Sequence, residues 1–117
     1  MITTKQTGTL LEVRIYNKLT LADFQEFEQA VGSELKKAPK IRLLLDFTDM
    51  LDYTIDVAWE EIKFTRAHAH DFKRIAVITP GQWVPWLAWV GAAFTDAEVR
   101  IFEDGKLALA WLNNKVE

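Results

Sequence analysis

The side chains of this chain that could do chemistry are few, and the most suggestive group is His68, His70 and Asp71. On one helix, residues two positions apart point about 200° away from each other, so the two histidines cannot hold one metal ion together. His68 and Asp71 can approach each other, but two ligands are too few for a zinc site. We therefore interpret this group as a solvated helix end, where the helix dipole favours histidine.

A second group consists of acids that follow a buried apolar run. Their carboxylate oxygens are the ligands that Mg²⁺ and Ca²⁺ prefer, and ligands bind beyond the carboxyl ends of parallel strands. The spacing, however, lacks the glycine of a calcium-binding loop, and acids in loops and helix caps need no metal. We predict no metal site and no cofactor for these residues, which are Asp46, Asp49, Asp52 and Asp56.

The remaining nucleophiles and bases do not form a catalytic pattern. The chain has no cysteine and no Gly-x-Ser-x-Gly segment, and its one serine, Ser33, lies among surface-like residues of a predicted helix. Residues 80–82 form a single-glycine turn rather than a phosphate-binding loop. Glu60 and Glu61 are typical of a solvated helix face. We therefore expect no catalytic residues and a protein that is not an enzyme.

An uncharged, tryptophan-rich stretch is the main remaining feature. No charged residue occurs from Ile75 to Thr95, and three of the five tryptophans fall within seven residues of this stretch. Residues 83–94 are predicted to form a helix, with Pro85 in its first turn, where a missing N–H does no harm. A helix that is apolar all round requires burial, a membrane, a bound apolar ligand or a partner chain.

We predict that this helix and the helix before it enclose an apolar binding pocket. Apolar pockets with few polar groups are the usual form of small-molecule sites, and an apolar or lipid-like molecule is the expected ligand. Three alternatives remain open: the rings fill an ordinary core, they form a homodimer seam, or they touch a membrane at the headgroup level. The predicted pocket residues are Trp59, Phe64, Trp83, Trp86, Trp89 and Phe94.

Composition limits the partners and the compartment. The net charge of −3 supplies no basic surface for nucleic acid. The absence of cysteine fits a reducing cytoplasm, and the first residues lack the pattern of a signal peptide. Residues 80–81 interrupt the uncharged stretch and leave a helix of about 12 residues, or about 18 Å, which is too short to cross a membrane. We expect a cytoplasmic protein, with peripheral contact at the inner membrane surface as a further expectation.

These residues must be positioned by a fold in which strands and helices alternate. Periodicity predicts five strands, at residues 2–6, 11–16, 41–47, 74–79 and 98–102. It also predicts four helices, at residues 21–37, 57–71, 83–94 and 106–114. The order β-β-α-β-α-β-α-β-α predicts a single α/β domain over residues 1–117, with a mixed, mainly parallel five-stranded sheet covered by helices.

Two local signals mark boundaries between these elements. Thr20, with Asp23 three residues later, resembles a capping box and predicts where the first helix begins. Residues 48–56 are predicted to form a polar loop from the third strand to the second helix, whose start is capped by Thr54 or Asp56.

Several segments, in this order and spacing, resemble the SpoIIAA-like (STAS-like) bacterial domain family. They are KIRLLLDF at 40–47, WEEIKFTRAH at 59–68, DFKRIAVI at 71–78 and FTDAEVRIFE at 94–103, together with Trp83 and Trp86. The resemblance covers about residues 11–112 and implies a mixed sheet with helices on its faces. It also implies a likeness to the CRAL-TRIO lipid-binding domains, which have been compared with this arrangement.

The chain departs from the regulatory STAS domains at one functional segment. Those anti-sigma factor antagonists resemble one another at an Asp-Ser-Ser-Gly segment where the loop after the central strand enters a helix, and a serine there is phosphorylated. The corresponding stretch, 52–56, reads Asp-Tyr-Thr-Ile-Asp, so Thr54 is the only hydroxyl near that helix start besides Tyr53. Flanking acids would repel an added phosphate, and we expect no phosphoswitch.

Together these observations predict a non-enzymatic binding domain for an apolar or lipid-like small molecule, with peripheral membrane association as an accompanying property. The alternative is a STAS-like regulatory domain that binds a partner protein and lacks the phosphorylatable serine. The first hypothesis rests on the tryptophan-rich stretch, and the second rests on the resemblance.

Overall fold

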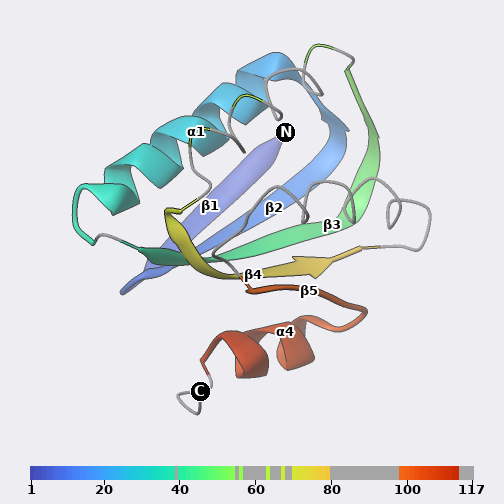
Figure 1. Ribbon diagram of the computed structural model, residues 1–117. Coiled ribbons are helices and arrows are strands. Elements are labelled where there is room, and N and C mark those ends of the chain that lie inside the picture. The colour runs from blue at the N-terminus through green and yellow to red at the C-terminus, as the bar shows by residue number, and fades with distance from the viewer. Residues whose placement is uncertain are drawn as a thin grey trace.

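The computed structural model describes residues 1–38, 40–54, 56, 63, 67, 70–79 and 98–113. Five strands within these residues form one sheet in the order β1-β2-β3-β4-β5 (Figure 1). The strands are β1 (Ile2–Thr7), β2 (Leu10–Leu19), β3 (Ile41–Tyr53), β4 (Phe72–Ile78) and β5 (Glu98–Phe102). β1 runs antiparallel to β2, and the other neighbours pair in parallel. The predicted mixed, mainly parallel five-stranded sheet is confirmed.

One described helix lies on each face of the sheet (Figure 1). The helix α1 spans Leu21–Leu35, and the helix α4, on the opposite face, spans Gly105–Leu112. Asp56, Lys63 and Ala67 are helical, but most of the predicted helix at 57–71 and all of the predicted helix at 83–94 lie outside the described residues. Of the helices in the described ranges, none is long and apolar enough to cross a membrane.

Alternation of side chains along the strands builds a hydrophobic core on each face of the sheet. The core under α1 includes Leu11, Val13, Phe24, Phe27, Leu43 and Ile75. The core under α4 consists of Leu10, Leu44, Ala76, Ile78, Ala108 and Leu112. Because β3 lies between two neighbours and is covered on both faces, its first half is mostly apolar rather than alternating.

The first helix begins where its capping box predicts. The hydroxyl oxygen of Thr20 accepts a hydrogen bond from Asp23 N at 3.3 Å, and Asp23 Oδ2 accepts one from Thr20 N at 3.1 Å. Asp23 Oδ2 also lies 2.7 Å from the ammonium nitrogen of Met1. Burial raises the pKa of the Asp23 carboxyl group, but the hydrogen bonds and the ammonium charge outweigh it and hold that pKa below its ordinary value.

The prediction of a polar loop at residues 48–56 is wrong for most of that stretch. β3 continues through Tyr53 because β2 also continues, to Leu19, and the two strands stay paired up to these residues. Two irregularities shift the register of this pairing, and Asn17 adopts a left-handed backbone with φ of 56°. The shifts break the period of two by which strands are recognised, so the sequence resembles a loop there.

The other bounds differ from the predicted ones by a few residues. β2 extends beyond the predicted range 11–16 at both ends, and β4 starts two residues before the predicted 74–79. α1 ends at Leu35 rather than at residue 37. α4 begins at Gly105 because Asp104 caps it, with Asp104 Oδ1 accepting a hydrogen bond from the backbone N–H of the second helical residue at 2.8 Å.

We expect Asp23→Asn to lower the free energy of unfolding by about 1 kcal/mol near neutral pH, because the start of α1 loses a charged cap. The folded-state pKa of Asp23 lies below its unfolded value. Its contribution is therefore present above the unfolded pKa and is lost as the pH falls through the folded pKa. Urea unfolding at several pH values should show the two proteins converging in acid.

Asp49→Asn, at an exposed position on β3, is the matched control and should change stability little at any pH. A deficit of Asp23→Asn that stays constant into strong acid would contradict the assignment of this stabilisation to the Asp23 charge.

Candidate functional site

The residues predicted to line an apolar pocket all lie outside the described residues, so that site stays a prediction. They are Trp59, Phe64, Trp83, Trp86, Trp89 and Phe94. Two other surfaces lie within the described residues. One is the carboxyl end of β3, and the other is the face of the sheet that carries α4.

The carboxyl end of β3 leads into residues 52–56, the stretch that the resemblance matches to the phosphorylated segment of regulatory STAS domains. The backbone N–H of Thr54 donates to the carbonyl of Leu19 at 3.1 Å, which fixes Thr54 at the end of the β2–β3 pair. The hydroxyl of Thr54 donates to a carboxylate oxygen of Asp56, a residue in helical conformation. An added phosphate would meet the charge of this carboxylate, which favours the expectation of no phosphoswitch.

Carboxylates also bind backbone donors along the second half of β3. The N–H of Thr48 donates to Asp46 Oδ1 at 2.9 Å, and the N–H of Tyr53 donates to Asp52 Oδ1 at 2.8 Å. Between these two positions Leu51 is 72% exposed, and its neighbour Asp52 is exposed as well. This end of the sheet therefore presents an apolar side chain to solvent among acidic groups.

An ion pair links the middle of β3 to β2. Arg14 Nε lies 3.6 Å from Asp46 Oδ2. A hydrogen bond with the Tyr16 side chain, followed by the charge of Asp46, raises the pKa of Arg14 above its ordinary value. Among the residues that the structure describes, no three His, Asp or Glu side chains are close enough together to hold a metal ion. The chemistry available at this end is that of a charged binding surface.

On the face of the sheet that carries α4, two arginines donate hydrogen bonds to the C-terminal end of this helix. Arg42 of β3 and Arg74 of β4 lie opposite each other in the strand register. Arg42 Nη1 donates to the carbonyl of Leu112 at 2.7 Å, and Arg74 Nη1 donates to the carbonyl of Trp111 at 2.7 Å. The last carbonyls of a helix lack partners within it and carry the negative end of its dipole, so both guanidinium groups stabilise this end.

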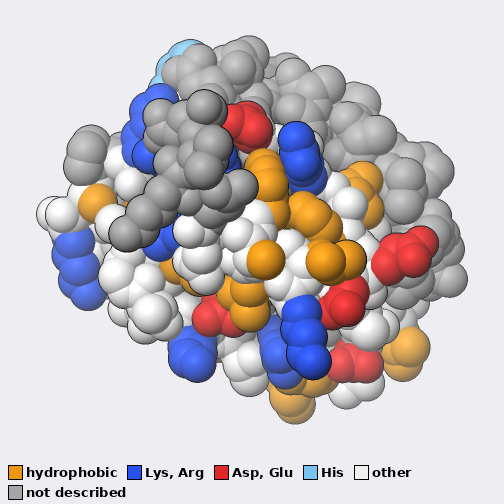
Figure 2. All heavy atoms as spheres, turned by 90° about the horizontal axis from the view of Figure 1, so that it is seen from below, with side chains coloured by type: hydrophobic (Ala, Val, Ile, Leu, Met, Phe, Trp, Pro, Cys, Tyr) orange, Lys and Arg blue, Asp and Glu red, His pale blue; other side chains and the backbone are white. Residues whose placement is uncertain are grey.

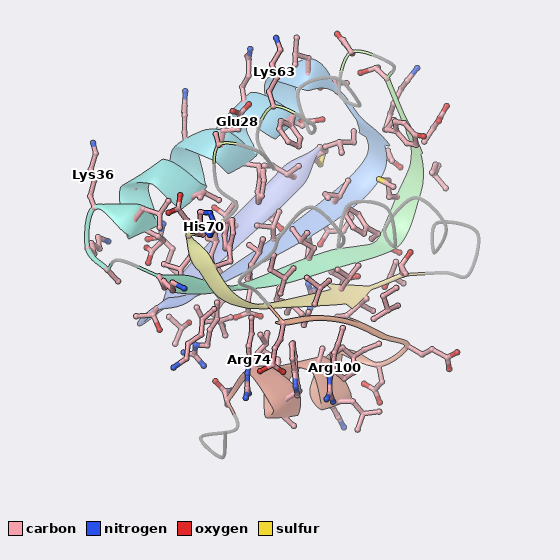
Figure 3. The ribbon with its side chains drawn as sticks, viewed as in Figure 1. Glu28, Lys36, Lys63, His70, Arg74 and Arg100 are labelled. Carbon is pink, nitrogen blue, oxygen red and sulfur yellow. The ribbon has the colours of Figure 1, made fainter. Side chains whose placement is uncertain are left out.

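The indole ring of Trp111 connects α4 to β4 and β5. The guanidinium carbon of Arg74 lies 5.2 Å from the ring centroid, and that of Arg100 lies 5.3 Å from it. The centroid of the Phe102 ring is 5.6 Å away. Figure 3 shows the side chains of Arg74 and Arg100 on the α4 side of the sheet. Each cation–π contact contributes about 0.5–1 kcal/mol at exposed sites and more when desolvated.

The sequence patterns do not identify these arginine contacts. Arg42 and Arg74 each interrupt an apolar strand, and a charge in such a strand requires a partner when the strand is buried. Each charge therefore indicates that its arginine has a partner, but it does not identify that partner. The partner of Arg42 lies 70 residues further along the chain. Trp111 lies in the predicted helix at residues 106–114, and nothing in its local sequence indicates these ring contacts.

The model of the SpoIIAA-like family matches residues 10–113, which include β2 to β5 and both described helices. This chain belongs to the SpoIIAA-like family. The resemblance inferred from the sequence segments is thereby confirmed. No curated protein matches this SpoIIAA-like chain in sequence.

Three solved structures share the fold of this SpoIIAA-like domain. An uncharacterised protein with a SpoIIAA-like fold from Shewanella loihica PV-4 is 31% identical, with a TM-score of 0.75 over 96% of this chain and 92% of that one. The anti-sigma factor antagonist SpoIIAA in its unphosphorylated form is 8% identical, with a TM-score of 0.67 over 97% and 99% of the two chains. The phosphorylated form of the Bacillus cell fate determinant SpoIIAA is 8% identical, with a TM-score of 0.63 over 97% and 100%.

We expect Arg74→Met to lower the free energy of unfolding by about 1.5–3 kcal/mol, because it removes a charged hydrogen bond to the end of α4. Urea unfolding measures the change. Arg14→Met is the matched control, because the Arg14 side chain is 64% exposed and its contacts with Asp46 and Tyr16 lie at the surface, so its loss should cost at most about 1 kcal/mol. Equal losses in the two variants would contradict a structural role of Arg74 at α4.

Proposed function

We propose that this SpoIIAA-like domain is a non-catalytic regulatory domain that acts by binding another protein. The observation that carries the proposal is the alignment of 97% of the chain with the anti-sigma factor antagonist SpoIIAA. An antagonist of another protein acts through a protein–protein interface. Among the described residues no group of three His, Asp or Glu side chains could hold a metal ion, and Asp49, Asp52 and Asp56 at the end of β3 are exposed.

The carboxyl end of β3 is the surface that best fits a protein partner. Leu51 is 72% exposed, and burying a leucine side chain contributes about 1.5–3 kcal/mol. Asp49, Asp52 and Asp56 around it are exposed and carry one sign of charge. The expected partner presents an apolar contact surrounded by basic side chains, since opposite potentials favour specific association.

Regulation of this interface by phosphorylation is not part of the proposal. Thr54, the hydroxyl residue nearest the helix start within the described residues, donates its hydroxyl to Asp56. Carboxylates next to this hydroxyl would oppose the charge of a phosphate. Binding would then depend on the presence of the partner rather than on a covalent switch in this domain.

The test begins with capture of partners from the source bacterium on the immobilised full chain, followed by calorimetry with the purified partner. We expect Leu51→Glu to weaken binding at least tenfold, about 1.4 kcal/mol, because it places a charge in the apolar contact. Leu107→Glu makes the same change on α4 and should leave binding unchanged, as should Thr54→Val.

Two outcomes would contradict this proposal. One is full binding by Leu51→Glu, which would show that the interface does not include the carboxyl end of β3. The other is loss of binding in Thr54→Val together with phosphate on Thr54 in the protein isolated from cells, which would show that phosphorylation regulates the interface.

A second candidate function is the binding of an apolar or lipid-like small molecule. It is supported by the uncharged stretch at residues 75–95 with its three tryptophans. In this proposal the rings enclose the ligand, while a homodimer seam and contact with a membrane surface are alternative uses of the same side chains. The proposed contacts are Trp59, Phe64, Trp83, Trp86, Trp89 and Phe94.

Native mass spectrometry of freshly purified protein, compared with the same sample after denaturation, tests this second function. We expect additional mass that is lost on unfolding and is reduced in Trp86→Ala, whose stability should fall by no more than about 1 kcal/mol. Unchanged mass together with a stability loss of about 3–5 kcal/mol would place Trp86 in a packed core and reject the function.

A further inference from the structure

The outward face of α4 carries apolar side chains beside Lys106, although the helix already buries an apolar face against the sheet. Ala108 and Leu112 are buried under the helix, whereas Leu107 is 61% exposed and Ala110 is exposed as well. Figure 2 shows this side of the molecule, with hydrophobic side chains gathered near its centre and charged side chains around them. A helix that is hydrophobic on both sides is typical of one that is covered on both sides.

Opposite charges lie at the two ends of this helix. Glu103 and Asp104 immediately precede its first residue. At its other end Arg42, which is half-buried, donates to a last carbonyl, and Arg100 is exposed. Arg74 donates to a last carbonyl as well but is buried, so Arg42 and Arg100 are the arginines that reach the surface at this end. The α4 surface therefore has an acidic end, an apolar middle and a basic end.

Three further charges modify this pattern without reversing it. Lys106 lies in the first turn and lowers the negative charge of the acidic end. Glu98 lies opposite Arg74 in the strand register and lowers the positive charge of the basic end. Arg100, which stacks on the ring of Trp111, adds to the basic end.

We propose that a second copy of this chain covers the α4 surface, with the two α4 helices antiparallel across a twofold axis. In that arrangement the acidic end of each helix lies beside the basic end of the other, and Leu107 of each copy meets the apolar middle of its partner. A twofold interface uses the same patch on both copies, so the patch must be complementary to itself. The order of charges along α4 meets this condition.

The same order of charges favours a second copy over a membrane as the occupant of the α4 surface. An anionic membrane surface attracts a patch with basic residues around the apolar centre. Here Glu103 and Asp104 would face the anionic headgroups. The described charges thus favour a partner that carries both signs.

The length of α4 predicts the strength of the association. Eight residues span about 12 Å, which supplies less area than the roughly 800 Å² per partner of a stable interface. The dimer should therefore dissociate on dilution. It should also weaken as salt is added, because its two ends associate through exposed charges.

Sedimentation equilibrium of the full chain over a wide concentration range is the test. We expect the mass to rise from 13.5 kDa toward twice that value with concentration, and to fall back as salt is added. Leu107→Glu should raise the dimer dissociation constant at least about tenfold, because a twofold interface contains the change twice. Leu51→Glu, the same substitution at a residue exposed on β3, is the control and should leave the constant unchanged.

Ala110→Arg is a second disruptive variant at an exposed position of α4, and circular dichroism checks that all variants fold. Three results would overturn the proposal. They are a monomer mass at every concentration, a dimer that persists in both folded α4 variants, and a dimer lost only in Leu51→Glu.

Discussion

The parallel pairing of β2, β3 and β4 is the constraint on which the rest of the structure depends. A strand with neighbours on both sides directs alternate side chains to opposite faces, so Leu43 and Leu44 enter two different cores. Such a sheet is stable only when both faces are covered. Within the described residues, α1 covers one face and α4 covers the other.

The cover on the second face is short, and its attachment depends on charge as well as on apolar contact. A helix of eight residues is not stable by itself in water, so α4 must be held by its surroundings. Arg42 and Arg74 supply donors to its last turn, and the helix end in turn supplies partners for two guanidinium groups on the strands. Sheet and helix therefore stabilise each other through these hydrogen bonds.

The parts of this fold that could be predicted from the sequence are those with local signals. The apolar run at 41–47 predicts a strand from its composition alone, and the capping box at Thr20 and Asp23 predicts where α1 begins. The second half of β3 could not be predicted, because its register is set by irregular pairing with β2. The exposure of Leu107 could not be predicted either, because a helix with apolar residues on both sides does not indicate which side packs against the sheet. The tryptophan-rich pocket stays a prediction.

The unequal lengths of β3 and β4 have a consequence for aggregation. β4 pairs with β3 only as far as Asp46, so among the described strands the last residues of β3 have a neighbour on one side alone. Strand edges with free backbone donors recruit strands from other molecules. Here the carboxylates of Asp46 and Asp52 already bind the N–H groups of Thr48 and Tyr53. Two backbone donors along this stretch are thereby satisfied within the chain, which lowers its capacity to recruit a strand from another molecule.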